Sequence, residues 1–165
     1  MIRRHFIHIG SVALGGLALD ACARAASLHP ADASTPTPAP VDAATFTRAR
    51  RFASTSFGEI AYVDYGSGPA ALFIHGYPLN GFQWRGAIAR LAGARRSIAP
   101  DLMGLGFTNI AATQAITPET QVSMLLALLD TLRIDTCDVL GNDSGGMIAQ
   151  LLVMRAPHRV RSLLL

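Results

Sequence analysis

The sequence predicts an α/β fold: a mostly parallel sheet preceded by an antiparallel hairpin. From residue 70 onward, short apolar runs alternate with amphipathic segments, as in folds built from right-handed strand–helix–strand crossovers. The run Ala70-Ala71-Leu72-Phe73-Ile74 is continuously apolar, as expected of a strand covered on both faces. Two β-prone runs, 51–56 and 60–65, meet at Phe57-Gly58-Glu59 and indicate the hairpin.

The remaining elements follow in order along the chain. Apolar residues at helical spacing predict a helix over 82–92, and an apolar run predicts a strand over 97–101. Thr117 as N-cap and Pro118 at the first helical position begin a stronger helix. Its expected apolar stripe is Val122, Leu125, Leu126, Leu129 and Leu132. A strand over 136–141, a helix over 145–156 and a strand over 160–165 follow. The predicted sheet then has about six strands, the last of which reaches the final residue of the given sequence.

The N-terminus is typical of an export signal. Arg3-Arg4 precedes a mildly apolar run too short to span a bilayer comfortably, which resembles a twin-arginine signal over residues 1–26. We therefore expect a periplasmic or extracellular protein, with lipid anchoring at Cys22 as a second choice. A merely basic N-terminus or a wrongly assigned start is the alternative. Residues 27–45, rich in Pro, Ala and Thr, predict a linker, and residues 46–165 the folded domain.

Composition excludes several kinds of partner. The net charge is only +3, and the arginines are scattered instead of forming the basic face that nucleic-acid binding needs. Outside the signal the lone Cys137 lies in a predicted buried strand, where it acts as a small apolar residue. We expect a small-molecule substrate, no nucleic acid, no stable membrane span after signal removal, no metal and no cofactor. The oligomeric state is not predicted.

Two motifs lie where predicted strands end. His75-Gly76-Tyr77-Pro78 follows one strand, and Gly141-Asn142-Asp143-Ser144-Gly145-Gly146 follows another. In parallel sheets, sites form at the carboxyl ends of strands. The second motif suits a sharp strand-to-helix turn, in which small residues stand two positions on either side of a nucleophile. Gly141 and Gly145 flank Asp143 symmetrically, so the candidate nucleophile is an aspartate.

These patterns resemble the α/β-hydrolase fold, over about residues 50–165, the first half of the usual domain. The turn Tyr65-Gly66-Ser67-Gly68-Pro69 and the loop Asp101-Leu102-Met103-Gly104-Leu105-Gly106 agree with the resemblance as well. An aspartate at the elbow, together with the HGxP loop, is similar to the epoxide hydrolase and haloalkane dehalogenase branch. The resemblance implies catalysis through an aspartyl ester at Asp143, with an oxyanion hole formed by the backbone N–H groups of Tyr77 and Ser144.

Departures from the branch narrow the expected activity. Haloalkane dehalogenases usually carry Trp after the nucleophile and Asn in the HG loop, and fluoroacetate-type dehalogenases carry Arg after the nucleophile. This chain has Ser144 and Tyr77 at those positions, so epoxide hydrolysis is the leading interpretation. The family's general base histidine and its acid partner come later than Leu165, beyond a helical lid. A truncated, catalytically inactive fragment is therefore an alternative, for which we expect aggregation through the 160–165 strand edge or dependence on a partner.

Other readings of the same residues stay open. Asp143 could merely cap its helix, and a serine-type esterase could use Ser144 as nucleophile. His75 is interpreted as a structural hydrogen-bonding residue of its loop, and His158 as solvated. Phe82 and Trp84 are interpreted as core or pocket wall. Asp101 ends a strand near the site, but this chain offers it no histidine to orient.

Overall fold

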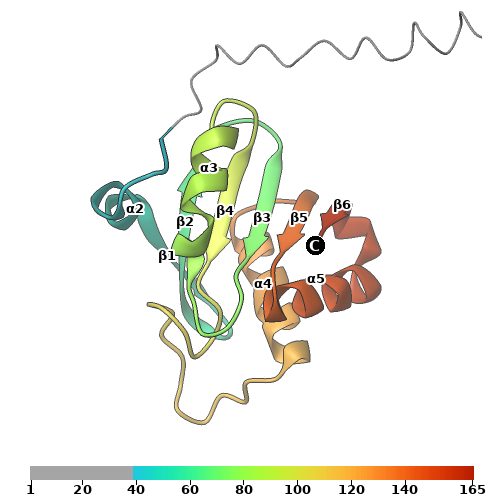
Figure 1. Ribbon diagram of the computed structural model, residues 1–165. Helices are drawn as coiled ribbons and strands as arrows, with labels where there is room; N and C mark the ends of the chain where they lie inside the picture. Colours follow the sequence, from blue (N-terminus) through green and yellow to red (C-terminus); the bar gives the residue numbers. More distant parts are fainter. Residues whose placement is uncertain (1–38) are drawn as a thin grey trace, which may run out of the picture. The chain divides into compact units, whose positions relative to one another are not determined.

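The computed structural model describes residues 39–165, which form one compact unit around a six-stranded sheet (Figure 1). The strands are β1 (Arg50–Thr55), β2 (Gly58–Tyr65), β3 (Ala70–Ile74), β4 (Arg96–Pro100), β5 (Cys137–Gly141) and β6 (Val160–Leu164). Their order in the sheet is β1-β2-β4-β3-β5-β6. The β1–β2 and β2–β4 pairs are antiparallel, and the other pairs are parallel. The predicted fold class is therefore confirmed.

Helices cover both faces of the sheet. Helix α3 (Arg85–Leu91), which follows the 3-10 turn η1 (Gly81–Trp84), packs on one face, and α4 (Pro118–Thr131) and α5 (Ser144–Arg155) pack on the other. Strand β3 divides its side chains between them: Leu72 and Ile74 join the core under α4 and α5, whereas Ala71 and Phe73 join the core under α3. This alternation with a period of two explains why the strand is apolar throughout.

Helix α2 (Ala43–Ala49) was not predicted, because it crosses the boundary between the composition-biased stretch interpreted as linker and the predicted domain. The Asp42 side chain caps the helix by accepting a hydrogen bond from the Thr45 N–H. Phe46 is buried and meets the Phe82 ring edge-on, with 5.2 Å between ring centroids. One anchored aromatic thus holds this short helix on the domain. The predicted signal over 1–26 and most of the predicted linker lie outside the described residues.

The buried face of α4 differs from the expected stripe. Val122, Leu125 and Leu129 are buried as predicted, but Leu126 and Leu132 are only partly covered. The fully covered set also includes Gln121, Met124 and Leu128. The reason is that α4 contacts both α5 and β1, so its covered face is wider and turned relative to a single stripe. Among the helices of the described residues, none is long and apolar enough to cross a membrane.

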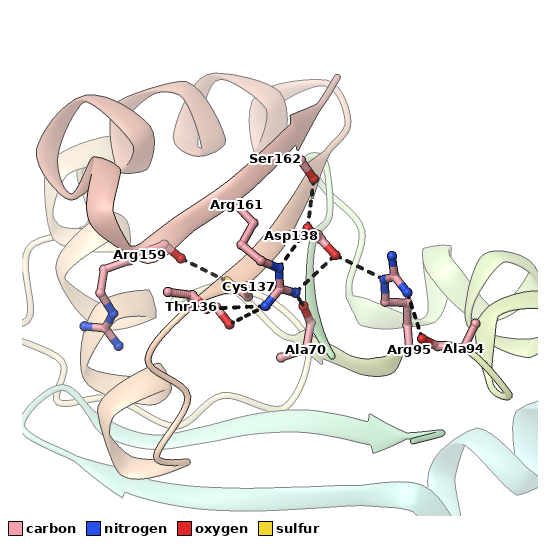
Figure 2. Close-up of polar contacts among 9 residues, drawn as sticks. All are labelled: Ala70, Ala94, Arg95, Thr136, Cys137, Asp138, Arg159, Arg161 and Ser162. Carbon is pink, nitrogen blue, oxygen red and sulfur yellow. Dashed lines mark hydrogen bonds and ion pairs between the residues drawn. The ribbon is translucent and has the colours of Figure 1, made fainter. Parts of the chain in front are cut away.

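Strand β6 is fixed at the amino end of the sheet by a charged cluster (Figure 2). The Asp138 carboxylate accepts hydrogen bonds from Arg95, Arg161 and Ser162. Arg161 also donates to the backbone carbonyl oxygen of Ala70, at 2.7 Å. One guanidinium therefore ties β6 to β5 and to the start of β3. Residues 161–165 are otherwise exposed.

Candidate active site

Asp143 stands at the turn between β5 and α5. Its backbone has φ 54° and ψ −128°, a conformation uncommon for residues other than glycine. Its carboxylate accepts a hydrogen bond from the Ser144 N–H at the start of α5, where helix N–H groups lack partners within the helix. The side chain lies on the exposed side of the turn. The carboxylate thus projects from a sharp, strained bend and is held by a backbone donor.

Glycines at the two small positions of the elbow are required by close backbone contacts. A Cβ atom at Gly145 would lie 2.4 Å from the carbonyl oxygens of Ile74 and His75. A Cβ atom at Gly141 would lie 2.6 Å from the carbonyl oxygen of Gly145. Both distances are far below van der Waals contact, so the symmetric spacing around Asp143 has a steric reason in the fold.

The loop after β3 packs directly on this elbow. A Cβ atom at Gly76 would lie 2.7 Å from the Asp143 Cβ atom, so the two motifs noted in the sequence share one site. The Tyr77 N–H donates a hydrogen bond of 2.9 Å to the Ser144 Oγ. Of the two expected oxyanion-hole donors, Ser144 N–H therefore already faces the Asp143 carboxylate, and Tyr77 N–H is engaged by the neighbouring hydroxyl.

His75 is buried beneath this loop and organises it. Its Nε2 accepts a hydrogen bond of 2.9 Å from the Leu102 N–H, and its Nδ1 lies 3.0 Å from the Gly76 carbonyl oxygen. These partners select the neutral tautomer with the proton on Nδ1. Burial lowers the pKa of His75, against smaller opposing contributions from the Gly76 hydrogen bond and the Asp101 charge. Both ring nitrogens are occupied, in agreement with the structural interpretation.

Asp101 plays a similar part for the loop after β4. Its Oδ1 accepts from the Gly81 N–H at 2.8 Å, and its Oδ2 accepts from the Phe107 N–H at 2.9 Å. A Cβ atom at Gly106, where φ is +58°, would lie 2.3 Å from Oδ2. The buried carboxylate therefore shapes two loops, and within the described residues it faces no histidine that it could orient.

Two glutamines that were not predicted from the sequence also hold the loops around the elbow. Gln83 accepts a hydrogen bond from the Gly76 N–H at 2.9 Å and donates one to the Asn142 Oδ1 at 2.7 Å, so it bridges the two motifs. Gln121 is buried and pairs with both the N–H and the carbonyl of Met103. A polar residue bordering the apolar stripe of α4 was the available signal for Gln121. No comparable signal marked Gln83.

A hollow of about 420 Å³ opens beside the elbow. It is lined by Tyr77, Leu102, Met103, Gly104, Leu105, Ile116, Gln121, Ser144 and Ile148. No charged side chain lines it, and the Gln121 amide is already paired with Met103. A larger hollow of about 600 Å³ lies beside Arg95 and Asp138, at the other end of the sheet. Of these two hollows in the described residues, the smaller one adjoins both motifs.

Other residues singled out in the sequence lie away from the elbow or in the core. Trp84 is half-buried, with its ring centroid 5.3 Å from that of Phe73, and Phe82 packs in the same cluster. His158 is exposed in the 3-10 turn η2 (Pro157–Arg159) after α5. Cys137 is buried in β5, and burial raises the pKa of its thiol to about 11. Within residues 39–165, no group of three His, Cys, Asp or Glu side chains could hold a metal ion.

Comparison with known proteins identifies the fold family. The family model for the alpha/beta hydrolase fold matches residues 69–165. A 2-hydroxy-6-oxo-2,4-heptadienoate hydrolase of Pseudomonas putida is 36% identical over 105 residues, which cover 62% of this chain and 38% of that protein. Epoxide hydrolase 2 of Siraitia grosvenorii is 40% identical over 100 residues, covering 59% of this chain and 32% of the relative. Haloalkane dehalogenases match as well.

A solved structure, the epoxide hydrolase VrEH1 of Vigna radiata, superposes with a TM-score of 0.66 at 27% identity. The match covers 69% of this chain and 38% of that one. The chain therefore spans about a third to two fifths of the length of the relatives it matches.

Proposed function

The chain belongs to the alpha/beta hydrolase fold family, and we propose that Asp143 is the nucleophile of an epoxide hydrolase that acts through an aspartyl ester. One observation carries the proposal: a carboxylate, with no cation paired to it among the described residues, stands at the apex of the β5–α5 elbow. As a helix cap alone, an aspartate would not need the positive φ or the three close-packed glycines around it.

The chemistry follows from the groups at the elbow. A carboxylate oxygen of Asp143 attacks an sp³ carbon of the epoxide, the carbon–oxygen bond of the ring breaks, and its electron pair goes to the ring oxygen, which takes up a proton from water. Water then hydrolyses the ester, while the backbone N–H of Ser144 stabilises the oxyanion that forms on the acyl group, joined by the Tyr77 N–H once it leaves its present acceptor, the Ser144 Oγ. The Ser144 N–H already donates to the Asp143 carboxylate, so this donor needs little reorganisation.

The second step requires a base to activate water, and neither described histidine suits that role. His75 is fixed by Leu102 and Gly76, and His158 follows the far end of α5. We therefore expect the base and its acid partner outside the described residues. Ser144, one residue past the apex, accepts from the Tyr77 N–H, which argues against its being the nucleophile of an esterase.

The hollow beside the elbow supports an uncharged, apolar substrate. Its lining is mainly aliphatic and contains no arginine or other cation. A carboxylate-bearing substrate, such as the printed name of the heptadienoate hydrolase implies for that relative, would find no partner in this lining. An epoxide with an aryl or alkyl substituent fits the lining better.

The test uses protein expressed from its whole reading frame and styrene oxide as substrate. Quenched reactions analysed by mass spectrometry should show one alkyl group on the peptide containing Asp143, and diol should accumulate. Asp143→Ala should lose the adduct and lower the rate of diol formation by at least about 1,000-fold. Alanine avoids the ambiguity of an asparagine that deamidates. Alkylation at Ser144 instead, or diol formation by Asp143→Ala at the original rate, would refute the proposal.

A further inference from the structure

The side chain of Gln83 connects the loop after β3 to the elbow. Its Oε1 accepts a hydrogen bond of 2.9 Å from the Gly76 N–H, and its Nε2 donates one of 2.7 Å to the Asn142 Oδ1. A backbone N–H can only donate, so Gly76 fixes which end of the planar amide is the oxygen. Among the described residues, Gln83 is the one residue outside the two motifs whose side chain bonds to both.

The turn η1 gives this side chain a firm base. The Gly81 N–H at its start donates to the buried Asp101 carboxylate at 2.8 Å. Phe82 and Trp84, on either side of Gln83, pack against the core under α3. The position of the amide is therefore set by the core and by a buried carboxylate, independently of the two motifs that it connects.

Gly76 needs such an anchor more than its neighbours do. Packing against the elbow excludes a side chain here, and a glycine backbone has more conformational freedom than that of any other residue. The Gly76 carbonyl oxygen accepts from the Leu79 N–H at 2.9 Å and lies 3.0 Å from the His75 Nδ1. Gln83 holds the N–H of the same residue. Because the next N–H along the chain is that of Tyr77, these contacts set where the second proposed oxyanion donor stands.

The direct hydrogen bond between the two motifs cannot hold the loop throughout the reaction. The Tyr77 N–H donates to the Ser144 Oγ, and it has to leave this acceptor in order to bind the oxyanion. The Gln83 bridge uses the N–H of the preceding residue, so it stays intact while the Tyr77 N–H turns. It is therefore a contact that can keep the loop at the elbow while the ester is hydrolysed.

We infer that Gln83 is a positioning residue, which holds the Tyr77 and Ser144 N–H groups at the separation that the oxyanion of the ester requires. The inference rests on the proposed function.

This role belongs to the second step of the reaction. Water, losing a proton to the base, attacks the carbonyl carbon of the ester, and the carbonyl electron pair moves to the oxygen that the two N–H groups stabilise. When the intermediate collapses, the bond to the alkyl oxygen breaks, and this oxygen takes the proton from the base. The Asp143 carboxyl group then releases a proton to solvent. In the first step the carboxylate loses its charge, so alkylation depends less on these donors.

The two steps can be separated by following the ester itself. Protein expressed from its whole reading frame is mixed with styrene oxide, and the ester on Asp143 is measured by rapid quenching and mass spectrometry as it forms and decays. Gln83→Met removes both hydrogen bonds at similar side-chain volume, and Asn142→Ala removes only the one to the elbow. Gln150→Met is the matched control, because Gln150 is exposed and its amide bonds only within α5 among the described residues.

We expect Gln83→Met to slow hydrolysis of the ester about 10- to 100-fold and its formation less than about 3-fold, so that the ester accumulates. The kcat and KM values should then fall together, because the slow step follows ester formation. Asn142→Ala should also slow hydrolysis, and the double variant should be no slower than Gln83→Met, because both changes break one bridge. Gln150→Met should match the wild type at both steps.

Unfolding midpoints show whether each variant remains folded. Asn142 is exposed, so Asn142→Ala carries the test if Gln83→Met does not fold. Equal slowing of both steps in a folded variant, or hydrolysis at the wild-type rate, would overturn the positioning role while leaving the nucleophile intact. Wild-type protein that forms no ester at Asp143 would instead refute the proposed function, and the positioning role with it.

Discussion

The two ends of the sheet are built by different interactions. At the amino end, four ion pairs join the described residues: Arg95 and Arg161 with Asp138, Arg96 with Asp64, and Arg159 with Asp130. At the carboxyl end, the Asp101 and Asp143 side chains accept hydrogen bonds from backbone N–H groups, and neither pairs with a cation within residues 39–165. Glycine contacts and neutral side chains hold the loops there.

The difference separates the task of holding the sheet together from that of exposing the Asp143 carboxylate, the proposed nucleophile. A guanidinium beside Asp143 would reduce the nucleophilicity of its carboxylate and occupy the position of a substrate carbon. Backbone N–H donors can hold the carboxylate without covering it. The amino end has no such constraint, so arginines can fix the edge strand β6 there (Figure 2).

Gly145→Ala should have the largest effect, because the carboxyl end depends on close backbone packing. The new Cβ atom would lie 2.4 Å from two carbonyl oxygens of the β3 end, and neither can move without shifting the strand or the elbow. We expect a loss of about 3 kcal/mol or more in the free energy of unfolding, measured by urea denaturation.

Two other glycines serve as matched controls for this substitution. Gly146 is the next residue of α5, and the atom nearest to its added Cβ would be 3.6 Å away. Gly86 in α3 has nothing within 4 Å. Alanine at each should be neutral or stabilise by up to about 1 kcal/mol. If Gly145→Ala had the same free energy of unfolding as these two variants, close backbone packing at the elbow would not be important for stability.

His75→Leu tests the neutral hydrogen bonds of the carboxyl end. It leaves the buried Leu102 N–H without an acceptor, so we expect a loss of about 2 kcal/mol at neutral pH. Because burial lowers the pKa of His75, the unfolded chain takes up a proton at a pH at which the folded protein does not. The contribution is complete above the ordinary value of 6.5 and is lost as the pH falls through the lowered pKa.

The stability of the wild type should therefore approach that of His75→Leu on acidification from about pH 7 to about pH 5. Urea denaturation of both proteins at several pH values measures this difference. If the difference in the free energy of unfolding between the two proteins stayed constant over this pH range, protonation of His75 would not be coupled to unfolding.

Asp138→Asn should have the smallest effect, and it should depend on salt. The arginines around Asp138 are partly exposed, so we expect a loss of only about 1 kcal/mol at low ionic strength, shrinking in about 1 M NaCl. Arg161 lowers the pKa of Asp138 below its ordinary value of 3.8. The contribution of the Asp138 carboxylate to the free energy of unfolding is therefore present above pH 3.8 and is lost as the pH falls below that value.

Asp135→Asn is the control for Asp138→Asn, since Asp135 is exposed and makes no ion pair with the described residues. Thermal unfolding at low and high salt compares the two variants. The Gly145→Ala loss should not respond to salt. A salt-independent effect of Asp138→Asn would break the contrast between the two ends of the sheet.

Much of the fold could be predicted from local patterns, because the spacing of apolar residues and the positions of turn-forming residues are local properties of the sequence. The strand at 70–74, the N-cap at Thr117 and the hairpin all lie where the sequence placed them, within a few residues. Helix α2 could not be predicted, since it depends on the distant contact of Phe46 with Phe82. The same reason applies to the wider buried face of α4.

For the candidate site, the sequence predicted that the two motifs would meet, because both follow strands of one parallel sheet. It also gave the structural interpretation of His75. The bridge from Gln83 to Gly76 and Asn142 could not be predicted, because an isolated glutamine carries no pattern. The roles of Asp143, Tyr77 and Ser144 in catalysis stay predictions, as do the export signal, the localisation and the expected aggregation.

The unusual backbone at Asp143 has a consequence for how such a fold diversifies. Gly141, Gly145 and Gly76 leave no room for side chains around the bend, whereas the side chain at its apex is exposed. A different reactive group could therefore be installed at that single position with the surrounding architecture unchanged. Under the proposed role of Asp143, a change of one codon would replace the reactive group before any other part of the molecule adapts.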